Sequence, residues 1–392
     1  MKDMLYLAWR YVLYHRWKTL ILVLAITLVV FLPAALNVLI ERSAQQLTAR
    51  AENTPLLLGA KGSPLELALS SLYFDADTPS LARFTDADLI RETGLAEPVP
   101  LYVRFRASGY SIVGTTLDYF AFRELQYAAG RPLVVLGEAV IGATVARELE
   151  LAVGDSIVSS PESAFDLAGV YPLKMMVVGI LEPAYSADDD AVFVDVKTSW
   201  VIEGLGHGHQ DLESVESSAV MSRDKDRIVA NASLVQYNEI TPENSDSFHF
   251  HGDLSDYPLS AVLVVPNDTK SGVILQGRLE NAEADTQIVR PGEIIEALLE
   301  TVFTIQQFVV AAVALVGTAT IAVAVLVILL SLRLRRRERL TLFKIGGSQS
   351  VIAGVMAAEI MAVIIASSLL ALALTVIVDR YGAGLMRALL LT

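Results

Sequence analysis

Three apolar stretches constrain this chain more than any other feature of its sequence. They cover residues 19–40, 303–332 and 350–378, and Glu359 is the one charged residue inside them. Because a helix rises 1.5 Å per residue, each stretch is long enough to cross a hydrocarbon layer about 30 Å thick. We therefore expect an integral membrane protein, and a cytosolic enzyme is excluded.

The first apolar stretch predicts a retained membrane span rather than a cleaved signal peptide. Its apolar run exceeds the roughly 7–15 residues of a signal-peptide core, and Pro33 lies inside it. Cleavage near Ala34 and Ala35 is the alternative. The chain contains no cysteine, which excludes disulfides and thiolate metal sites.

Basic residues flank the apolar stretches unevenly and predict their orientation. One cluster precedes residues 19–40, and the other separates the second and third stretches, where Glu338 is the only acid. The positive-inside rule places both clusters in the cytoplasm. Residues 41–302 then face the other side, with 40 of the 44 acids and 18 of the 30 bases. So acidic a segment argues against nucleic acid as a partner.

These patterns predict an α-helical membrane protein with three membrane-spanning helices and a large mixed α/β extracytoplasmic domain. Before the first span, aromatic residues such as Trp9 and Trp17 lie among bases, which is typical of a helix at the lipid headgroups. Such a helix serves as an anchor or also contacts a cytoplasmic partner. The expected segments are an amphipathic interfacial helix (1–18), the first span (19–40), the outer domain (41–302), the second span (303–332), a cytoplasmic loop (333–349), the third span (350–378) and an extracytoplasmic tail (379–392).

The outer segment alternates strand-like and helix-like runs. Residues 84–90 and 143–149 predict short helices, and residues 203–257, rich in Gly, Ser, Asp, His and Asn, are expected to be the least regular part. We expect residues 41–52 to extend the first span, and a helix that begins at Pro291 to continue into the second. Runs rich in Val, Ile and aromatic residues predict strands at 99–106, 110–114, 139–141, 156–159, 175–180, 191–194 and 261–265.

Two sets of residues carry a resemblance to a known family. The first set lies in the outer domain and comprises Tyr110–Phe120, Gly130-Arg131-Pro132, Gly137–Gly142, Val145–Leu149, Val153-Gly154-Asp155 and Val177–Leu181. In this order it resembles the periplasmic core domain of MacB-type ABC transporter permeases. The second set, Arg337-Glu338-Arg339-Leu340 with Gly346-Gly347-Ser348 and then Glu359, resembles the loop of the FtsX-like permease domain.

The resemblance spans nearly the whole chain and implies a mechanotransmission-type (type VII) permease subunit. It implies a homodimer that works with a separate ABC ATPase dimer. That ATPase would bind ATP and magnesium, so this chain would be neither an enzyme nor a cofactor protein. A periplasmic lipoprotein or adaptor and membrane lipid are further candidate partners. The implied location is the bacterial cytoplasmic (inner) membrane, with the N-terminus in the cytoplasm and the large domain in the periplasm.

In such permeases the basic loop forms a coupling helix that docks on the ATPase. The positions that match this role are Arg337, Glu338 and Lys344 as polar contacts, Leu340 and Phe343 as inserted apolar contacts, and Gly346 at the end of the helix. The simpler alternative is that a short basic loop only fixes topology.

The C-terminal residues depart from the family pattern, which usually includes a fourth span. Residues 379–392 are too short to cross a membrane. We expect a three-span variant whose tail lies on the outer leaflet; a shortened chain is the alternative.

The function that the resemblance implies is coupling of ATP hydrolysis to movement of a periplasmic domain. This domain would handle or extrude substrate from the periplasm or the outer leaflet, since nothing in the spans lines a hydrophilic pore. The alternatives are an FtsX-like regulator of a cell-wall hydrolase and a membrane-anchored sensor or binding receptor with no ATPase. The chain has no G-x-x-x-x-G-K-[ST] sequence, which excludes ATP binding of the P-loop kind.

Four of the five histidines form two pairs in the outer segment. The pairs are His207 with His209 and His249 with His251. Alternate residues of an extended segment point the same way, and neutral imidazoles are common ligands for zinc or copper. If the two loops converge, four nitrogens meet; otherwise both pairs are solvated loop residues. Metal is therefore a candidate here and not part of the expected function.

Overall fold

The computed structural model divides into two units, which we describe separately. The helical unit comprises residues 1–46 and 298–392, and the α/β unit comprises residues 47–297. The residues that the structure describes are 6, 9–10, 13–74, 80–160, 172–208, 220–224, 227–230, 238–279, 285–334, 341, 344 and 348–390.

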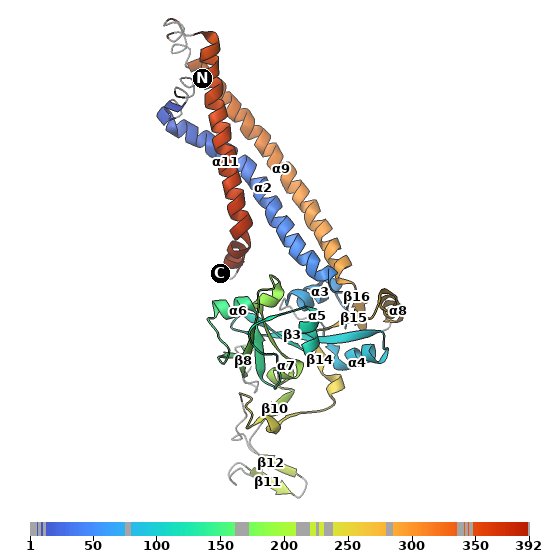
Figure 1. Cartoon of the computed structure of the whole chain (residues 1–392). Coiled ribbons are helices and arrows are strands. Elements are labelled where there is room, and N and C mark those ends of the chain that lie inside the picture. The colour runs from blue at the N-terminus through green and yellow to red at the C-terminus, as the bar shows by residue number, and fades with distance from the viewer. Residues whose placement is uncertain are drawn as a thin grey trace. The chain divides into compact units, whose positions relative to one another are not determined.

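Three long helices account for the apolar stretches (Figure 1). They are α2 (Arg16–Glu52), α9 (Pro291–Leu334) and α11 (Gln349–Leu390). By length and composition, Arg16–Glu52, Pro291–Val327 and Ala353–Gly382 are able to cross a membrane. The three long apolar helices expected from the sequence are present, and α11 continues through most of the predicted tail.

Within the helical unit, α2 and α11 run parallel to each other. Thr27 Oγ1 donates to the carbonyl oxygen of Ser367 at 3.2 Å. Further along both helices, Arg42 pairs with Asp379 at 2.7 Å. Because the partner numbers rise together, the two helices point the same way.

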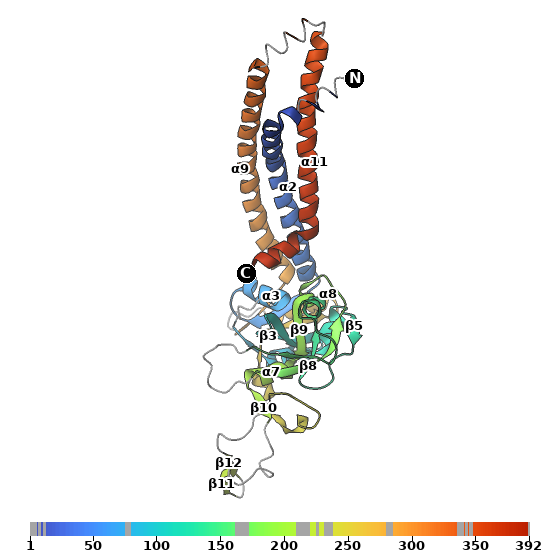
Figure 2. The same cartoon turned by 90° about the vertical axis from the view of Figure 1, so that its left-hand side faces the viewer.

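Helix α9 runs antiparallel to α2 within the same unit (Figure 2). Gln306 Nε2 donates to Asn37 Oδ1 at 2.7 Å. A Cβ added at Gly317 would lie 2.9 Å from Val29 Cγ1, so the two helix backbones approach closely there. Successive long helices therefore alternate in direction: α2 and α11 point one way and α9 the other.

A 10-stranded sheet forms the centre of the α/β unit. Neighbouring strands are antiparallel, except that β4 pairs with β9 and β6 with β8 in parallel. The order is β16 (Thr286–Val289), β1 (Leu56–Ala60), β15 (Ala261–Pro266), β3 (Ala96–Ala107), β4 (Tyr110–Thr115), β9 (Ala191–Asp195), β6 (Glu138–Ile141), β8 (Lys174–Leu181) and β5 (Tyr127–Gly130), with β7 (Ser156–Val158) also paired to β8.

Strand β3 joins the two halves of this sheet. Its first part, Ala96–Leu101, pairs with β15, and its second part, Tyr102–Ala107, pairs with β4. Pro98 and Pro100 are tolerated in the first part because the alternate residues make the hydrogen bonds on that side; the Leu101 carbonyl, for example, accepts from the backbone N–H of Ser260, directly before β15. The proline nitrogens, which have no hydrogen to donate, thus face away from that neighbour.

The first and last strands of the α/β unit are hydrogen-bonded neighbours. Strand β1 follows α2 after Asn53–Pro55, and β16 precedes α9 with Arg290 between them. The two strands pair in register, with Leu57 opposite Val289. The chain therefore enters and leaves this unit on adjacent strands.

Helices and aromatic side chains fill the core around the sheet. Trp200, Tyr102, Tyr119 and Phe193 are among the largest fully buried side chains. The remaining elements include α3 (Pro64–Tyr73), α4 (Phe84–Glu92), α5 (Leu117–Phe122), α6 (Ala143–Glu148), α7 (Val196–Glu203), α8 (Thr269–Leu279), η1 (Ala187–Asp190), η2 (Ser245–Ser247), η3 (Leu254–Asp256) and the paired β2 (Ala82–Arg83) and β14 (Pro258–Leu259).

Close packing explains why position 114, one of the residues that carry the resemblance, is a glycine. A Cβ at this position would lie 2.0 Å from Ser199 Oγ, so only glycine lets α7 lie directly on β4. Asp195 caps α7 by accepting from the backbone N–H of Lys197 at 2.9 Å.

The elements expected from composition are confirmed in the α/β unit. All seven predicted strands and the helices at residues 84–90 and 143–149 are present. The described residues of the segment 203–257 include more strands than expected: β10 (Gly206–Gly208) pairs with β13 (Phe248–Phe250), and β11 (Val220–Asp224) pairs with β12 (Arg227–Ala230). Glycine and histidine disfavoured a strand assignment there, whereas cross-strand packing supplies the missing stabilisation.

Candidate functional site

The β10–β13 pair has two different faces. Its register places His207 opposite His249, Gly206 opposite Phe250 and Gly208 opposite Phe248. A Cβ at either glycine would lie within 2.6 Å of the facing phenyl ring, so the rings cover the glycines. Because side chains alternate across a strand, the phenylalanines occupy one face and the histidines the other.

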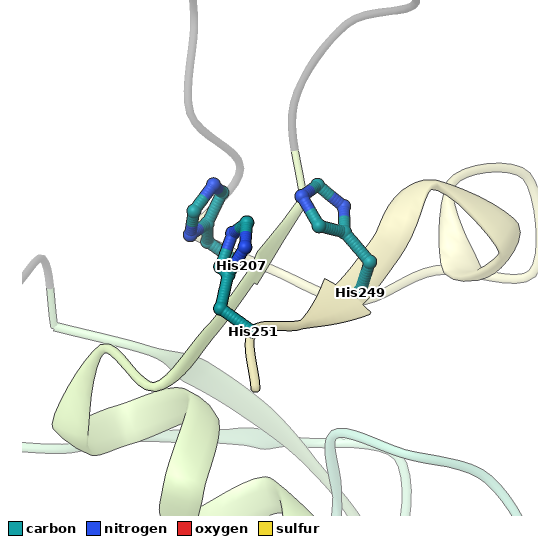
Figure 3. A group of neighbouring side chains, drawn as sticks. All are labelled: His207, His249 and His251. Atoms are coloured by element: carbon teal, nitrogen blue, oxygen red, sulfur yellow. The ribbon is translucent and has the colours of Figure 1, made fainter. Parts of the chain in front are cut away.

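Three histidines gather on the second face (Figure 3). His207, His249 and His251 each offer a ring nitrogen, and these nitrogens all lie within 4.8 Å of one another. His207 and His249 are half-buried and His251 is exposed. The structure thus brings together three of the four candidate ligands, and His209 lies outside the described residues.

Neighbouring groups hold this cluster in place. The Ser247 carbonyl oxygen lies 3.1 Å from His249 Nδ1. The Tyr257 hydroxyl donates to the carbonyl oxygens of Leu205 at 3.1 Å and of His251 at 2.8 Å. Tyr257 itself packs edge-on against Trp200, with ring centres 4.9 Å apart. The histidine-bearing strands are therefore anchored to the core.

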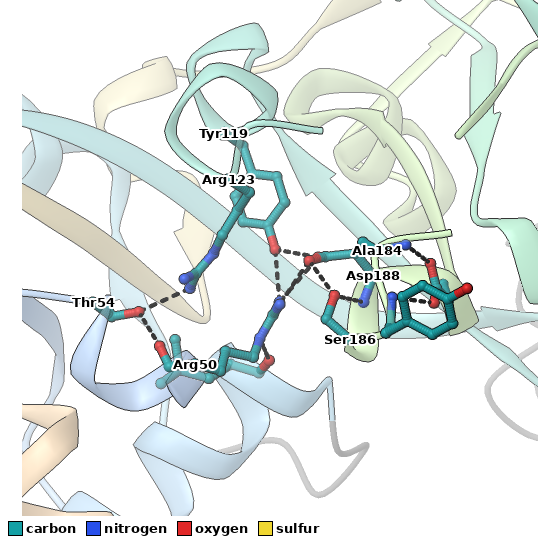
Figure 4. A network of polar contacts seen from close by, with 10 residues as sticks. Arg50, Thr54, Tyr119, Arg123, Ala184, Ser186 and Asp188 are labelled. Carbon is teal, nitrogen blue, oxygen red and sulfur yellow. Dashed lines mark hydrogen bonds and ion pairs between the residues drawn. The ribbon is translucent and has the colours of Figure 1, made fainter. Parts of the chain in front are cut away.

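A second polar cluster is buried in the α/β unit and was not predicted from the sequence (Figure 4). Arg50 Nη1 and Nη2 donate to the two carboxylate oxygens of Asp188 at 2.6 and 2.9 Å. The Tyr119 hydroxyl accepts from Arg50 at 2.8 Å and donates to Asp188 at 2.6 Å. Arg50 also donates to the carbonyl oxygen of Leu72. This bidentate geometry is the strongest form of arginine–carboxylate pair.

The remaining groups of this cluster complete its hydrogen bonds. Ser186 Oγ donates to Asp188 at 2.9 Å, and Thr54 Oγ1 donates to the Arg50 carbonyl at 2.9 Å. Arg123 Nη2 donates to Thr54 Oγ1 at 2.9 Å. The end of α2 is thereby tied to η1 and α5 through buried hydrogen bonds, and within the described residues Arg123 Nε is the one atom of this cluster left without a partner.

Burial and pairing oppose each other in the electrostatics of this cluster. Burial by itself raises the pKa of Asp188, but the neighbouring Arg50 outweighs it and holds that pKa below its usual range. Burial raises the pKa of the Tyr119 hydroxyl and lowers the pKa of the Arg123 guanidinium. At neutral pH the cluster therefore contains a charged Arg50–Asp188 pair and a neutral tyrosine.

Most predicted ATPase-coupling positions lie outside the described residues. These positions are Arg337, Glu338, Leu340, Phe343 and Gly346. Lys344 is described, and it is exposed and helical. A helix in the basic loop therefore stays a prediction.

The sequence matches one family model over more than half of the chain. Residues 19–236 match the MacB-like periplasmic core domain. No curated protein matches the chain. The match covers nearly all of α2 and most of the α/β unit, including the first set of residues that carried the resemblance; the second set, around residues 337–359, lies outside it.

Two solved structures are similar to part of the chain. The periplasmic region of MacB from Actinobacillus actinomycetemcomitans is 10% identical, with a TM-score of 0.36 over 63% of this chain and 93% of that one. The extracellular domain of the noncanonic ABC-type transporter YknZ from Gram-positive bacteria is 11% identical, with a TM-score of 0.33 over 60% of this chain and 98% of that one. The family assignment itself follows from the sequence match: the chain belongs to the MacB-like periplasmic core domain family and is a permease of the MacB/FtsX type of ABC transporter.

Proposed function

We propose that this permease is a non-catalytic subunit that transmits movement from a separate ABC ATPase to its α/β unit. A dimer of the chain would work with an ATPase dimer in the bacterial inner membrane. The N-terminus would lie in the cytoplasm and the α/β unit in the periplasm. Substrate would be handled by the α/β unit and would not pass between the helices.

The observation that carries this proposal is how α2 and α9 continue into the α/β unit. Residues 47–52 of α2 and residues 291–297 of α9 belong to that unit. The adjoining strands β1 and β16 are hydrogen-bonded neighbours. A shift of either helix would therefore act on one edge of the same sheet.

The buried Arg50 cluster adds a fixed point at the end of α2. Its pair with Asp188 is nearly inaccessible to water, with side-chain exposures of 7% and 2%. Leaving either charge unpaired in the core is costly, so α2 cannot slip past η1 without a large penalty. This supports α2 as a lever that moves with the sheet.

The partner ATPase can be tested by capture from native membranes with the full chain as bait. Leu340→Asp and Phe343→Asp should abolish capture, because a carboxylate would be desolvated in an apolar ATPase groove. Leu254→Asp, at an exposed position of the α/β unit, is the matched control. Capture by both loop variants at the wild-type level would contradict the proposed coupling helix.

Transmission can be tested separately from docking. Two glycines inserted between Thr54 and Pro55 should leave ATPase capture intact but remove stimulation of ATP hydrolysis, because flexible residues absorb movement. The same insertion after Gly109, in the exposed turn between β3 and β4, is the control. Full stimulation with the linker insertion would rule out the connection to β1 as the transmitting route and leave the Arg50–Asp188 pair as the route from α2.

A further inference from the structure

We propose that His207, His249 and His251 form a binding site for a divalent metal ion of the zinc type. The proposal stands apart from the transport function, because it rests on the β10–β13 pair alone. Within the described residues the cluster contains three histidines and no carboxylate. A ligand set of imidazoles alone favours zinc, copper or nickel over calcium or magnesium, which prefer oxygen ligands.

The rings are spaced as a single ion requires. All three pairs of ring centres are 4.9 Å apart, which places the rings at the corners of an equilateral triangle. When three imidazoles bind the same zinc ion at about 2.0–2.1 Å, their ring centres lie about 5 Å apart. Only side-chain rotation is then needed to bring the nitrogens, now within 4.8 Å, to the roughly 3.3 Å separation of zinc-bound nitrogens.

The backbone presents the three side chains without relying on a flexible loop. His207 and His249 are opposite one another in the ladder, and His251 follows His249 by two positions on the same face. The packing of the phenylalanines over the glycines on the other face keeps the histidine side chains on their own face. Tyr257 fixes the backbone of His251, which is the ligand outside the ladder.

A second contact selects the ring nitrogen of His249. With Ser247 O beside Nδ1 at 3.1 Å, the bond that forms is Nδ1–H donating to the carbonyl. The other nitrogen, Nε2, then carries the lone pair that a metal needs. A metal-bound histidine usually has such a backbone or carboxylate partner for its second nitrogen.

Three imidazoles leave one position of a tetrahedral ion open. Structural zinc sites usually have four protein ligands, whereas sites with three keep a place for water or an anionic ligand. The described residues supply three ligands, so the fourth is a residue outside the described part of the chain, such as His209, or a water molecule or an anion.

Zinc binding is measured on the full-length chain in detergent, with an affinity tag free of histidine and after metal removal by a chelator. Calorimetric titration with zinc chloride should give saturable binding of about one ion per chain. His249→Ala and His251→Ala should each weaken the affinity at least about tenfold. His15→Ala removes the one histidine outside the two pairs and is the matched control, with unchanged affinity expected.

A second readout separates loss of the site from loss of the fold. Because His251 is exposed, metal-free His251→Ala should unfold at the wild-type temperature, and zinc should raise the unfolding temperature of the wild type only. Cobalt bound to the wild type should give the intense visible absorption of a tetrahedral site. No saturable zinc binding, or binding retained in the His249→Ala/His251→Ala double variant, overturns the proposal.

Discussion

Helix α2 carries two arginine–aspartate pairs that belong to different units and differ in their surroundings. In the α/β unit, the side chains of Arg50 and Asp188 are 7% and 2% exposed. About two turns earlier, in the helical unit, the side chains of Arg42 and Asp379 are 63% and 35% exposed. The first pair lies among further hydrogen-bonding groups, and the second lies at the surface of its unit.

The difference indicates where this permease is able to move. An exposed pair contributes little and breaks cheaply, whereas breaking a buried pair leaves an uncompensated charge. The Arg42–Asp379 pair therefore gives little resistance to a shift of α2 against α11. The end of α2 must instead move together with the core of the α/β unit.

The largest effect is expected from Asp188→Asn, which leaves Arg50 buried without its counterion. The free energy of unfolding of the α/β unit should fall by about 3–5 kcal/mol. Fluorescence of the buried Trp200 reports it in a background where Trp9 and Trp17, the other two tryptophans, are phenylalanine.

Two further variants check the cause of that loss. Asp88→Asn, which breaks an exposed pair with Arg91, should change stability by less than about 1 kcal/mol. Replacing Arg50 and Asp188 together by leucine should recover much of the lost stability. A double variant as unstable as Asp188→Asn would show that the pair is not the source.

The next effect concerns the backbone that supports Asp188. A Cβ at Gly142 would lie 2.3 Å from the Asp188 carbonyl oxygen and 2.4 Å from that of Asp189. Because backbone atoms cannot move aside freely, Gly142→Ala should cost about 1–3 kcal/mol of unfolding free energy. Gly277→Ala in α8, where nothing lies within 4 Å, should instead stabilise by up to about 1 kcal/mol. Equal effects at both positions would contradict the packing argument.

The ion pair between Glu138 and Arg131 is partly exposed, and it predicts how the stability of the α/β unit depends on pH. Burial raises the pKa of this carboxyl group, but hydrogen bonds from Arg131, Val134 and Val135 outweigh burial and lower it. A carboxyl group with a lowered folded-state pKa stabilises the fold above its unfolded value, about 4.3, and this contribution disappears as pH falls through the folded value.

Glu138→Gln should therefore reduce the acid sensitivity of the α/β unit. We expect a loss of about 1 kcal/mol at pH 7, allowing for the solvent exposure of Arg131, and no loss once pH is below the folded pKa. Urea unfolding between pH 7 and pH 3 measures the difference. A constant gap between the two proteins across that range would refute the assignment.

The smallest effect is expected in the helical unit. Asp379→Asn should change its stability by less than about 1 kcal/mol, followed by helical circular dichroism during an SDS titration. Gln306→Leu, which removes the hydrogen bond to Asn37, should cost about 0.6 kcal/mol. A loss of several kcal/mol at Asp379 would remove the contrast between the two arginine pairs.

Local pattern was enough to predict most of the fold. The strands at 110–114 and 191–194 are short runs of β-branched and aromatic residues, and they were predicted correctly. Their parallel pairing was not predictable, because pairing depends on residues far apart in the sequence. The β10–β13 strands were missed because glycine and histidine have low strand propensity, and the packing of phenylalanine over glycine is visible only once the two are paired.

The histidine cluster and the Arg50 cluster also differ in how far local sequence pattern predicts them. Residue type and alternate spacing were enough to select the histidine pairs, but only the register of β10 and β13 brings His207 to His249. The Arg50–Asp188 pair spans 138 residues and belongs to no local motif. The available signal was weak: an arginine near the end of a long apolar helix, and the acidic run Asp188–Asp190.

The neighbouring positions of β1 and β16 have a consequence for engineering. A unit whose two chain ends leave from adjacent strands can be cut out before Leu47 and after Ala297 and closed by a linker, or transplanted between another pair of helices; Arg50 then stays with Asp188. The sheet would keep every strand pair, since the connections leave from its edge strand β16 and from the next strand, β1. The α/β unit is thus exchangeable as a whole without a change to the pairing inside its sheet.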